Sequence, residues 1–286
     1  MIAAGLWRIL KTPIPKELCN VKYSSTYSEI TKVQFINGIK SIKLHDQKTR
    51  NSLSIIMMED LIRHINSDGN NKNLRVIVLS ADGNIFSAGH NLKELTLEAG
   101  KAQQEKVFQL ATHLMHSIIN CPVPVIAQVN GLAAAAGCQL VAQCDIAICT
   151  ENSSFSTPGS NFGIFCSTPG VPMARKVLRS TSLNMLLTGL PISASEAKSS
   201  GLVTTVCLAE DLDMEVNKTC EAIKSKSRSV IELGKKFFYE QIDMDIKKAY
   251  YLGAAKMLEN LGMEDGQEGI KSFVEKRKPK WSHGNY

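Results

Sequence analysis

The feature that most constrains the fold is the run LRVIVLSA, which begins at Leu74. It is a continuous apolar run rather than an alternating one, which is typical of a strand buried on both faces. An apolar helical face precedes it and follows Ser52 and Ser54: Ile55, Met58, Leu61, Ile62 and Ile65. The order then repeats, with a helical pattern around Val107–Ile118, the strand PVIAQVN, an Ala-rich helix and the strand DIAIC. Because strands and helices alternate, a layered α/β core is predicted.

A β-hairpin is predicted at the start of this core. The apolar residues of KVQFINGIKSIKLH flank Asn37-Gly38, the preferred chemistry of a tight hairpin turn. From Ser182 onward the pattern becomes mainly helical. We therefore assign residues 29–200 to the core and residues 201–286 to a C-terminal, mainly helical subdomain. Its last helices carry apolar residues that fit self-association and packing on the core equally well: Phe237, Phe238, Tyr250, Tyr251 and Leu252.

The first 28 residues have a different composition, since four basic residues accompany a single acid, Glu17. Such an acid-poor segment is typical of a mitochondrial transit peptide, and a disordered tail is the alternative. The eight cysteines form no CxxC pair and fall mostly in apolar stretches, which indicates buried thiols in a reducing compartment. No disulfide framework or zinc site is predicted. His113 and His116 lie three residues apart without a third ligand, so they do not predict a metal site either.

Charge and hydropathy give no support to two further classes of protein. The net charge of +6 is modest, and the sequence has no zinc-finger or helix-turn-helix spacing, so nucleic-acid binding is not predicted. The least polar stretch, residues 131–149, contains Gln139, Gln143 and Asp145. It therefore does not predict a membrane span.

Two segments of small residues stand where a strand passes into a helix. They are NIFSAGHNLKEL, after the strand that begins at Leu74, and NGLAAAAGCQL, after PVIAQVN. A helix N-terminus exposes unpaired backbone N–H groups, and small side chains let a ligand oxygen approach them. Two such junctions that converge would form an oxyanion hole, in which each donor is typically worth ~10²–10³ in rate. Either segment alone also fits an ordinary helix start and an ordinary glycine loop.

The order of several sequence segments resembles the crotonase (enoyl-CoA hydratase/isomerase) superfamily from about residue 30 to the end of the chain. The segments are RNSLS, VIVLSADGNIFSAGHNLKEL, PVIAQVNGLAAAAGCQLVAQCDIAI, LTGLPISASEAKSSGLV and GIKSFVEKRKP. The resemblance implies a spiral of ββα units with a C-terminal helical oligomerisation subdomain. It further implies an acyl-CoA thioester substrate and no cofactor beyond the CoA of that substrate. The implied assembly is a homotrimer or hexamer. The implied role is in fatty-acid metabolism, in the mitochondrial matrix.

Carried over by position, the resemblance places the first oxyanion N–H on the backbone of His90 and the second on Ala136. It places further residues beside the bound CoA: Asn51, Ser52, Leu53, Ala88, Gly89 and Lys93. Lys93 and the terminal Lys276, Arg277 and Lys278 are candidate phosphate contacts, and solvated surface charge is the equally good alternative.

The departures from the family pattern bear directly on the reaction. The resemblance implies two catalytic glutamates, and their positions hold Gln139 and Gly159. A carboxamide does not titrate and glycine has no side chain, so general acid–base help worth ~10²–10⁴ in rate is lost. We expect enolate chemistry such as decarboxylation, or very weak hydration, and restoring both glutamates is the corresponding test.

Three neighbouring groups are candidate substitutes for the missing carboxylates. The His90 imidazole could act as a base, while Cys166 or Ser167 could act as a nucleophile or orient water. Each has a simpler interpretation, which for Cys166 is a small apolar filler. A non-enzymatic acyl-CoA sensor or regulatory protein is the alternative to an enzyme, which if active would be a lyase.

Overall fold

The fold is a mixed α/β structure built on two sheets. The computed structural model describes residues 30–284, so the predicted transit peptide at 1–28 lies outside the described residues. The larger sheet has the order β1-β2-β3-β5-β7-β10, and only its β1–β2 pair is antiparallel. Its strands are Thr31–Ile36, Ile39–Leu44, Val76–Ala81, Val125–Val129, Ile146–Thr150 and Thr205–Cys207. The predicted α/β core is confirmed.

A second, smaller sheet has the order β4-β6-β8-β9. Its strands are Ile85–Ser87, Leu132–Ala134, Ser154–Ser156 and Ile192–Ser193. Each of β3, β5 and β7 in the larger sheet is followed along the chain by a short strand of the smaller one, then by helical structure. This repeated strand–strand–helix unit is the predicted spiral, and it carries the chain from one sheet to the next three times.

The opening hairpin forms where the sequence predicts it. Asn37 and Gly38 both have positive φ, at 51° and 81°, as a two-residue turn with the right twist for a hairpin requires. The turn pairs Ile36 with Ile39 at the end of the antiparallel ladder.

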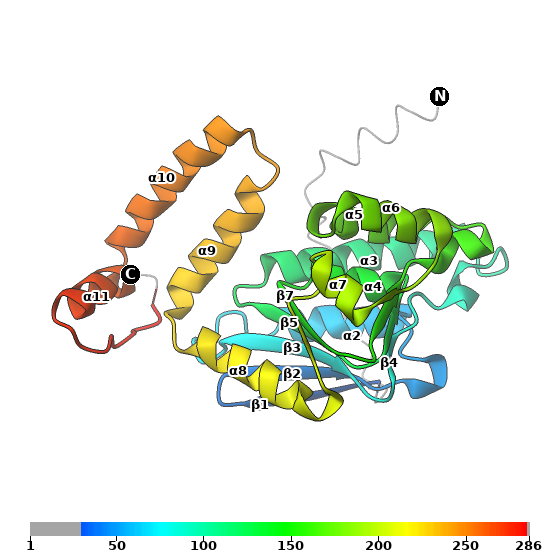
Figure 1. Ribbon diagram of the computed structural model, residues 1–286, viewed down its shortest axis with the longest axis horizontal. Helices are drawn as coiled ribbons and strands as arrows, with labels where there is room; N and C mark the ends of the chain where they lie inside the picture. Colours follow the sequence, from blue (N-terminus) through cyan, green and yellow to red (C-terminus); the bar gives the residue numbers. More distant parts are fainter. Residues whose placement is uncertain (1–29, 285–286) are drawn as a thin grey trace.

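Both faces of β3 are buried, which explains its continuous apolar run. Ile77 and Leu79 belong to the main core, whereas Val76 and Val78 pack with Leu212 and other residues of α8 on the opposite face. The main core lies against helices α2, α3 and α4, and Figure 1 shows α8 on the other side of the sheet. These four helices span Ile55–Asn66, Lys101–Asn120, Ala136–Gln143 and Leu212–Lys224.

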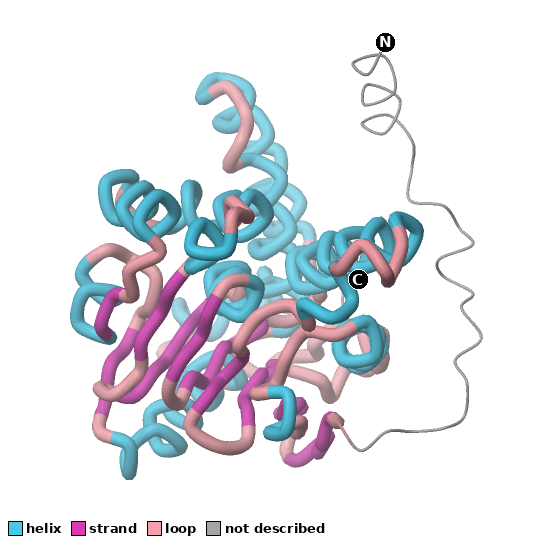
Figure 2. Tube along the Cα trace, turned by 90° about the vertical axis from the view of Figure 1, so that its right-hand side faces the viewer, coloured by secondary structure: helices cyan, strands magenta, loops and turns pink. Residues whose placement is uncertain are grey.

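The remaining helices cover one end of the core and extend beyond it. Helices α5, α6 and α7 span Ser167–Lys176, Arg179–Thr188 and Ala194–Ser199. Short 3₁₀ helices lie at Gln47–Thr49 (η2), Leu92–Leu95 (η3), Pro158–Phe162 (η4) and Ala209–Asp211 (η5). Helices α9, α10 and α11, at Arg228–Gln241, Ile246–Gly262 and Glu264–Val274, form a helical extension that projects from the sheets (Figures 1 and 2). None of the helices described is both long and apolar enough to cross a bilayer.

The helical extension is joined to the core through a partly buried carboxylate. Asp145, just before β7, accepts hydrogen bonds from Lys235 Nζ at 2.7 Å and Tyr239 Oη at 2.9 Å, both on α9. It also accepts from the Val125 N–H at 2.7 Å, which ties it to the start of β5. Lys235 further donates to the Ile118 carbonyl at 2.9 Å. This network anchors α9 to the strands that carry the second small-residue junction.

Candidate functional site

The two small-residue junctions meet at Gly89. They contain β4 and β6, which are parallel neighbours in the smaller sheet. A Cβ atom built on Gly89 would lie 2.9 Å from Ala135 Cβ and 3.1 Å from the Ala136 nitrogen. Gly89 also has a φ of +93°, which residues that carry a side chain rarely adopt. Glycine is thus required here both for the backbone conformation and for the close approach of the two segments.

Two backbone donors are left free at this meeting point. Among the described residues, neither the His90 N–H nor the Ala136 N–H donates to a protein acceptor. Ala136 is the first residue of α4, where the first-turn N–H groups have no partner within the helix. In the segment before α2, the Leu53 N–H donates to the Gly89 carbonyl at 2.8 Å, and Leu53 forms an isolated parallel β-bridge with His90. These contacts leave the His90 N–H free.

Ala135 holds a strained backbone conformation just before the second donor. Its φ of 49° and ψ of −118° lie in a region that favours glycine. Such a conformation costs about 1–3 kcal/mol and persists only where the surroundings fix it. Here the Ala135 N–H binds the Ser156 carbonyl at 2.9 Å, and its carbonyl accepts from Gln139 N–H at 3.0 Å. This conformation brings the start of α4 next to Gly89.

The segment Arg50–Leu53 lines this meeting point and is tied to it by the backbone. The Ala88 N–H donates to the Arg50 carbonyl at 3.1 Å. The Asn51 side chain accepts from the Asp46 N–H at 2.9 Å and donates to the Ile85 carbonyl at 2.8 Å. Because its amide is fully engaged in these bonds, Asn51 shapes the loop rather than offering a free side chain to a ligand.

Unpartnered buried polar atoms gather around the same place. Six buried side-chain polar atoms in the described chain have no hydrogen-bond partner. Five of them lie in segments that flank the two junctions: Ser52 Oγ, His90 Nε2, Gln139 Oε1, Thr157 Oγ1 and Ser160 Oγ. An unsatisfied buried group costs about 1–3 kcal/mol, so such a concentration points to a place that receives a ligand or ordered water. Thr157 and Ser160 were not predicted, because Ser and Thr are too common in loops to signal a site.

The His90 side chain is fixed by two contacts. Its Nδ1 lies 3.3 Å from the Leu53 carbonyl oxygen, and its ring meets Phe108 edge-on at a centroid distance of 5.7 Å. Since a carbonyl can only accept, Nδ1 carries the proton and Nε2 has a free lone pair. Burial lowers the pKa of His90, although the bond to Leu53 opposes the shift. The imidazole is therefore neutral around pH 7 and remains a candidate base.

The two positions of the missing glutamates hold neutral residues, and their surroundings differ. Gln139 is buried, with 4% of its surface exposed, one helical turn after Ala136. Gly159 lies against its own loop, because a Cβ there would be 2.2 Å from the Ile164 carbonyl oxygen and 2.7 Å from Cys166 Sγ. A glutamate at 139 fits the helix, whereas one at 159 requires the loop to move. The double restoration suggested by the sequence is thus not a simple exchange of side chains.

The other candidate nucleophiles and anion contacts have ordinary structural surroundings. Cys166 is buried, accepts from the Gly159 N–H at 3.3 Å, and has a thiol pKa raised by burial. Ser167 is exposed. Lys93 is exposed on η3, while Arg277 binds Glu268 on the helical extension, away from α4 in Figure 1. Within residues 30–284, no group of three or more His, Cys, Asp or Glu side chains could hold a metal ion.

Comparison with known proteins gives consistent matches. Residues 34–284 match the family model described as Enoyl-CoA hydratase/isomerase. A human relative named enoyl-CoA hydratase domain-containing protein 3, mitochondrial, is 51% identical over 253 residues, which is 88% of this chain and 84% of the relative. The mitochondrial enoyl-CoA hydratase of Pongo abelii is 30% identical over 85% of this chain and 83% of its own. The crystal structure of the human domain-containing protein 3 superposes with a TM-score of 0.87 at 50% identity, covering 88% of this chain and 100% of that one.

Proposed function

Because the chain belongs to the enoyl-CoA hydratase/isomerase family, we propose that it binds acyl-CoA thioesters and polarises their carbonyl at the Gly89 junction. The observation that carries the proposal is that two free backbone donors lie close together. A Cβ built on Gly89, the residue before His90, would lie 3.1 Å from the Ala136 nitrogen. In this proposal the thioester oxygen accepts from the His90 and Ala136 N–H groups. Ala88, Gly89 and the segment around Ser52 and Leu53 line the approach of the CoA.

The two donors favour chemistry in which negative charge develops on the thioester oxygen. Preorganised N–H groups stabilise such an enolate more than they stabilise the neutral carbonyl, which lowers the barrier. The strained Ala135 fixes the position of the second donor before the substrate arrives. The rate gain per donor is ~10²–10³ in comparable sites.

Neutral groups at positions 139 and 159 favour reactions that need no enzyme carboxylate. In the decarboxylation of a malonyl-type thioester, the bond between the α carbon and the carboxylate breaks and CO₂ leaves. The electron pair of the broken bond forms the enolate, whose α carbon then takes a proton from water. Hydration instead requires a base for water and an acid for the α carbon, so we expect it to be very weak.

A non-enzymatic acyl-CoA sensor or regulatory protein is the second candidate. It is favoured by the Gly159 loop, in which the Ile164 carbonyl and Cys166 Sγ occupy the space that a side chain would need. A loop closed in this way can keep a binding pocket while giving up proton transfer.

The names of the relatives and the exposed surface of the helical extension support a proposal on location and assembly. Close relatives carry the word mitochondrial in their names. We propose that this chain acts in the mitochondrial matrix, in fatty-acid metabolism. The helical extension exposes large apolar side chains, among them Tyr250 at 76%, Tyr251 at 81% and Phe273 at 85%. Such a surface fits contact with a second copy of the chain, and we propose a homotrimer or hexamer.

Calorimetric titration and turnover assays separate these alternatives. The purified protein is titrated with a saturated acyl-CoA and assayed with an enoyl-CoA and a malonyl-type CoA. Binding without turnover of either substrate supports the sensor, whereas CO₂ release above the uncatalysed rate supports the enzyme. Failure to bind any CoA thioester contradicts the pocket itself. The Gln139→Glu variant is the matched test of hydration, since it adds one carboxylate without a change at Gly159.

A further inference from the structure

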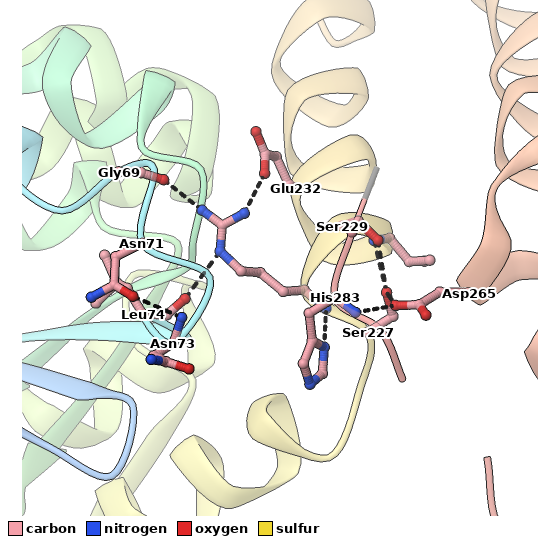
Figure 3. A network of polar contacts seen from close by, with 12 residues as sticks. Gly69, Asn71, Asn73, Leu74, Ser227, Ser229, Glu232, Asp265 and His283 are labelled. Carbon is pink, nitrogen blue, oxygen red and sulfur yellow. Dashed lines mark hydrogen bonds and ion pairs between the residues drawn. The ribbon is translucent and has the colours of Figure 1, made fainter. Parts of the chain in front are cut away.

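The C-terminal tail, residues 281–284, folds back into the junction between the helical extension and the core (Figure 3). Asp265 on α11 receives it. Its carboxylate accepts from the Ser282 N–H at 2.7 Å, from Ser282 Oγ at 3.0 Å and from the His283 N–H at 3.0 Å. It also accepts from Ser227 Oγ, next to α9, at 2.6 Å. One buried carboxylate thus joins the tail, α11 and the start of α9.

Arg228 joins the same point to the core. Its side chain is 7% exposed and donates from Nε to the Leu74 carbonyl at 3.1 Å and from Nη2 to the Gly69 carbonyl at 2.7 Å. Its third contact is Glu232 on α9, at 2.8 Å. The loop that leads into β3 is therefore held by the first residue of α9. Figure 3 shows Gly69 and Leu74 on the core side of this contact and Glu232 on α9.

His283 lies between two donors and can satisfy only one of them. Its Nδ1 is 3.3 Å from the Arg228 backbone nitrogen, and its Nε2 is 3.2 Å from Arg75 Nη1. A neutral imidazole has one acceptor nitrogen, and a protonated one has none. Protonation would remove the remaining acceptor and place a third cation beside two arginines.

We propose that the tail is a clasp that holds the helical extension against the core, and that protonation of His283 opens it. The charges that act on the ring are those of Arg75 from the core, Arg228 from α9 and Asp265 from α11. The Arg75 side chain contacts the ring directly, whereas the contacts with Arg228 and Asp265 each involve a backbone N–H. Two of these three oppose a positive ring. The clasp does not depend on the proposed acyl-CoA function, since none of its residues lines the Gly89 junction.

The pH window follows from the direction of the pKa shifts. Burial and the two arginines lower the pKa of His283 below its usual 6.5, while Asp265 opposes the shift. The clasp is therefore fully closed above pH 6.5, and its contribution is lost as the pH falls from there through the lowered pKa. Burial opposes ionisation of Asp265, but its hydrogen bonds lower its pKa, so it stays charged in this window.

Hydrogen exchange of the full chain at about pH 7.5 and about pH 5.5 tests the clasp, with rates corrected for intrinsic pH dependence. In the wild type, we expect protection of the amides at 227–230 and 282–284 to fall about tenfold at the lower pH, while β3 stays protected. The His283→Gln variant keeps an acceptor and does not titrate, so it should show equal protection at both values. Equal loss in this variant, or no loss in the wild type, would overturn the proposal.

Two truncated chains test the clasp without relying on the folding of the His283→Gln variant. A chain that ends at Trp281 lacks all three tail donors to Asp265, and we expect the amides at 227–230 to lose protection at both pH values. A chain that ends at Gly284 retains them and should behave as the wild type does. If the shorter chain keeps wild-type protection, the tail does not hold the extension. Acyl-CoA binding in the wild type, measured in parallel, reports separately on the proposed function.

Discussion

Replacing Gly89 by alanine perturbs the meeting point of the two junctions most directly. The new Cβ would lie 2.9 Å from Ala135 Cβ, 3.0 Å from the Ala134 carbonyl oxygen and 3.1 Å from the Ala136 nitrogen. The φ of +93° adds a backbone cost of about 1–2 kcal/mol, and crowding of this kind adds about 1–3 kcal/mol. We expect Gly89→Ala to lower the free energy of unfolding by about 2–5 kcal/mol.

The same methyl group would lie 3.1 Å from the Ala136 nitrogen and on the residue just before His90, so it crowds both proposed donors. Hydrogen bonds to a neutral carbonyl contribute about 1 kcal/mol each, so loss of access to both donors should weaken acyl-CoA binding about tenfold or more. Any turnover should fall by a further ~10²–10³, because the donors matter most when the oxygen is charged.

Gly100→Ala is the matched control. Gly100 has a similar φ of +82°, but a Cβ there meets nothing within 4 Å. Gly100→Ala should therefore lower the free energy of unfolding by only the backbone cost of about 1–2 kcal/mol. The variant should bind acyl-CoA as the wild type does. Urea unfolding and calorimetric titration measure the two effects separately. The reasoning is refuted if the Gly89 variant, folded under the titration conditions, binds as tightly as the Gly100 variant.

Three further predictions test neighbouring groups. Cys166→Ala should retain acyl-CoA binding and any turnover, because burial raises the thiol pKa and disfavours a thiolate; a covalent acyl adduct on the wild-type thiol, seen by mass spectrometry, would contradict this. Asp145→Asn should cost about 3–5 kcal/mol in urea unfolding, since it leaves Lys235 buried without its counter-charge, and a cost below about 1 kcal/mol would argue against the anchoring role. Gln139→Glu should lose stability relative to the wild type as the pH rises above about 4.3, because a buried carboxylate lacks a partner there; parallel pH profiles for the two proteins would exclude this.

Much of the fold follows from local sequence patterns. The Asn37-Gly38 turn is confirmed, and the apolar run after Leu74 is a strand buried on both faces, as its lack of alternation predicts. These features depend on residues adjacent in sequence, which fix turn geometry and burial. The His90 and Ala136 N–H groups have no protein acceptor within residues 30–284, and their role as oxyanion donors stays a prediction.

Features that depend on distant contacts could not be predicted in this way. The strain at Ala135 arises from its bonds to other segments, since alanine by itself favours an ordinary helix. The loop at Gly159 folds back on Ile164 and Cys166, which a missing side chain does not reveal. The contact of His283 with Arg75 joins residues 208 positions apart. No local pattern encodes such a pair.

A crystal structure with a non-hydrolysable acyl-CoA tests the central claim most directly. The quantity to measure is the distance from the carbonyl oxygen of the bound acyl group to the backbone nitrogens of His90 and Ala136. We predict that the oxygen lies about 2.7–3.1 Å from both nitrogens at once. An oxygen bound elsewhere, with Gln139 or a water molecule as its nearest donor and both backbone N–H groups still free, would contradict the proposed oxyanion site.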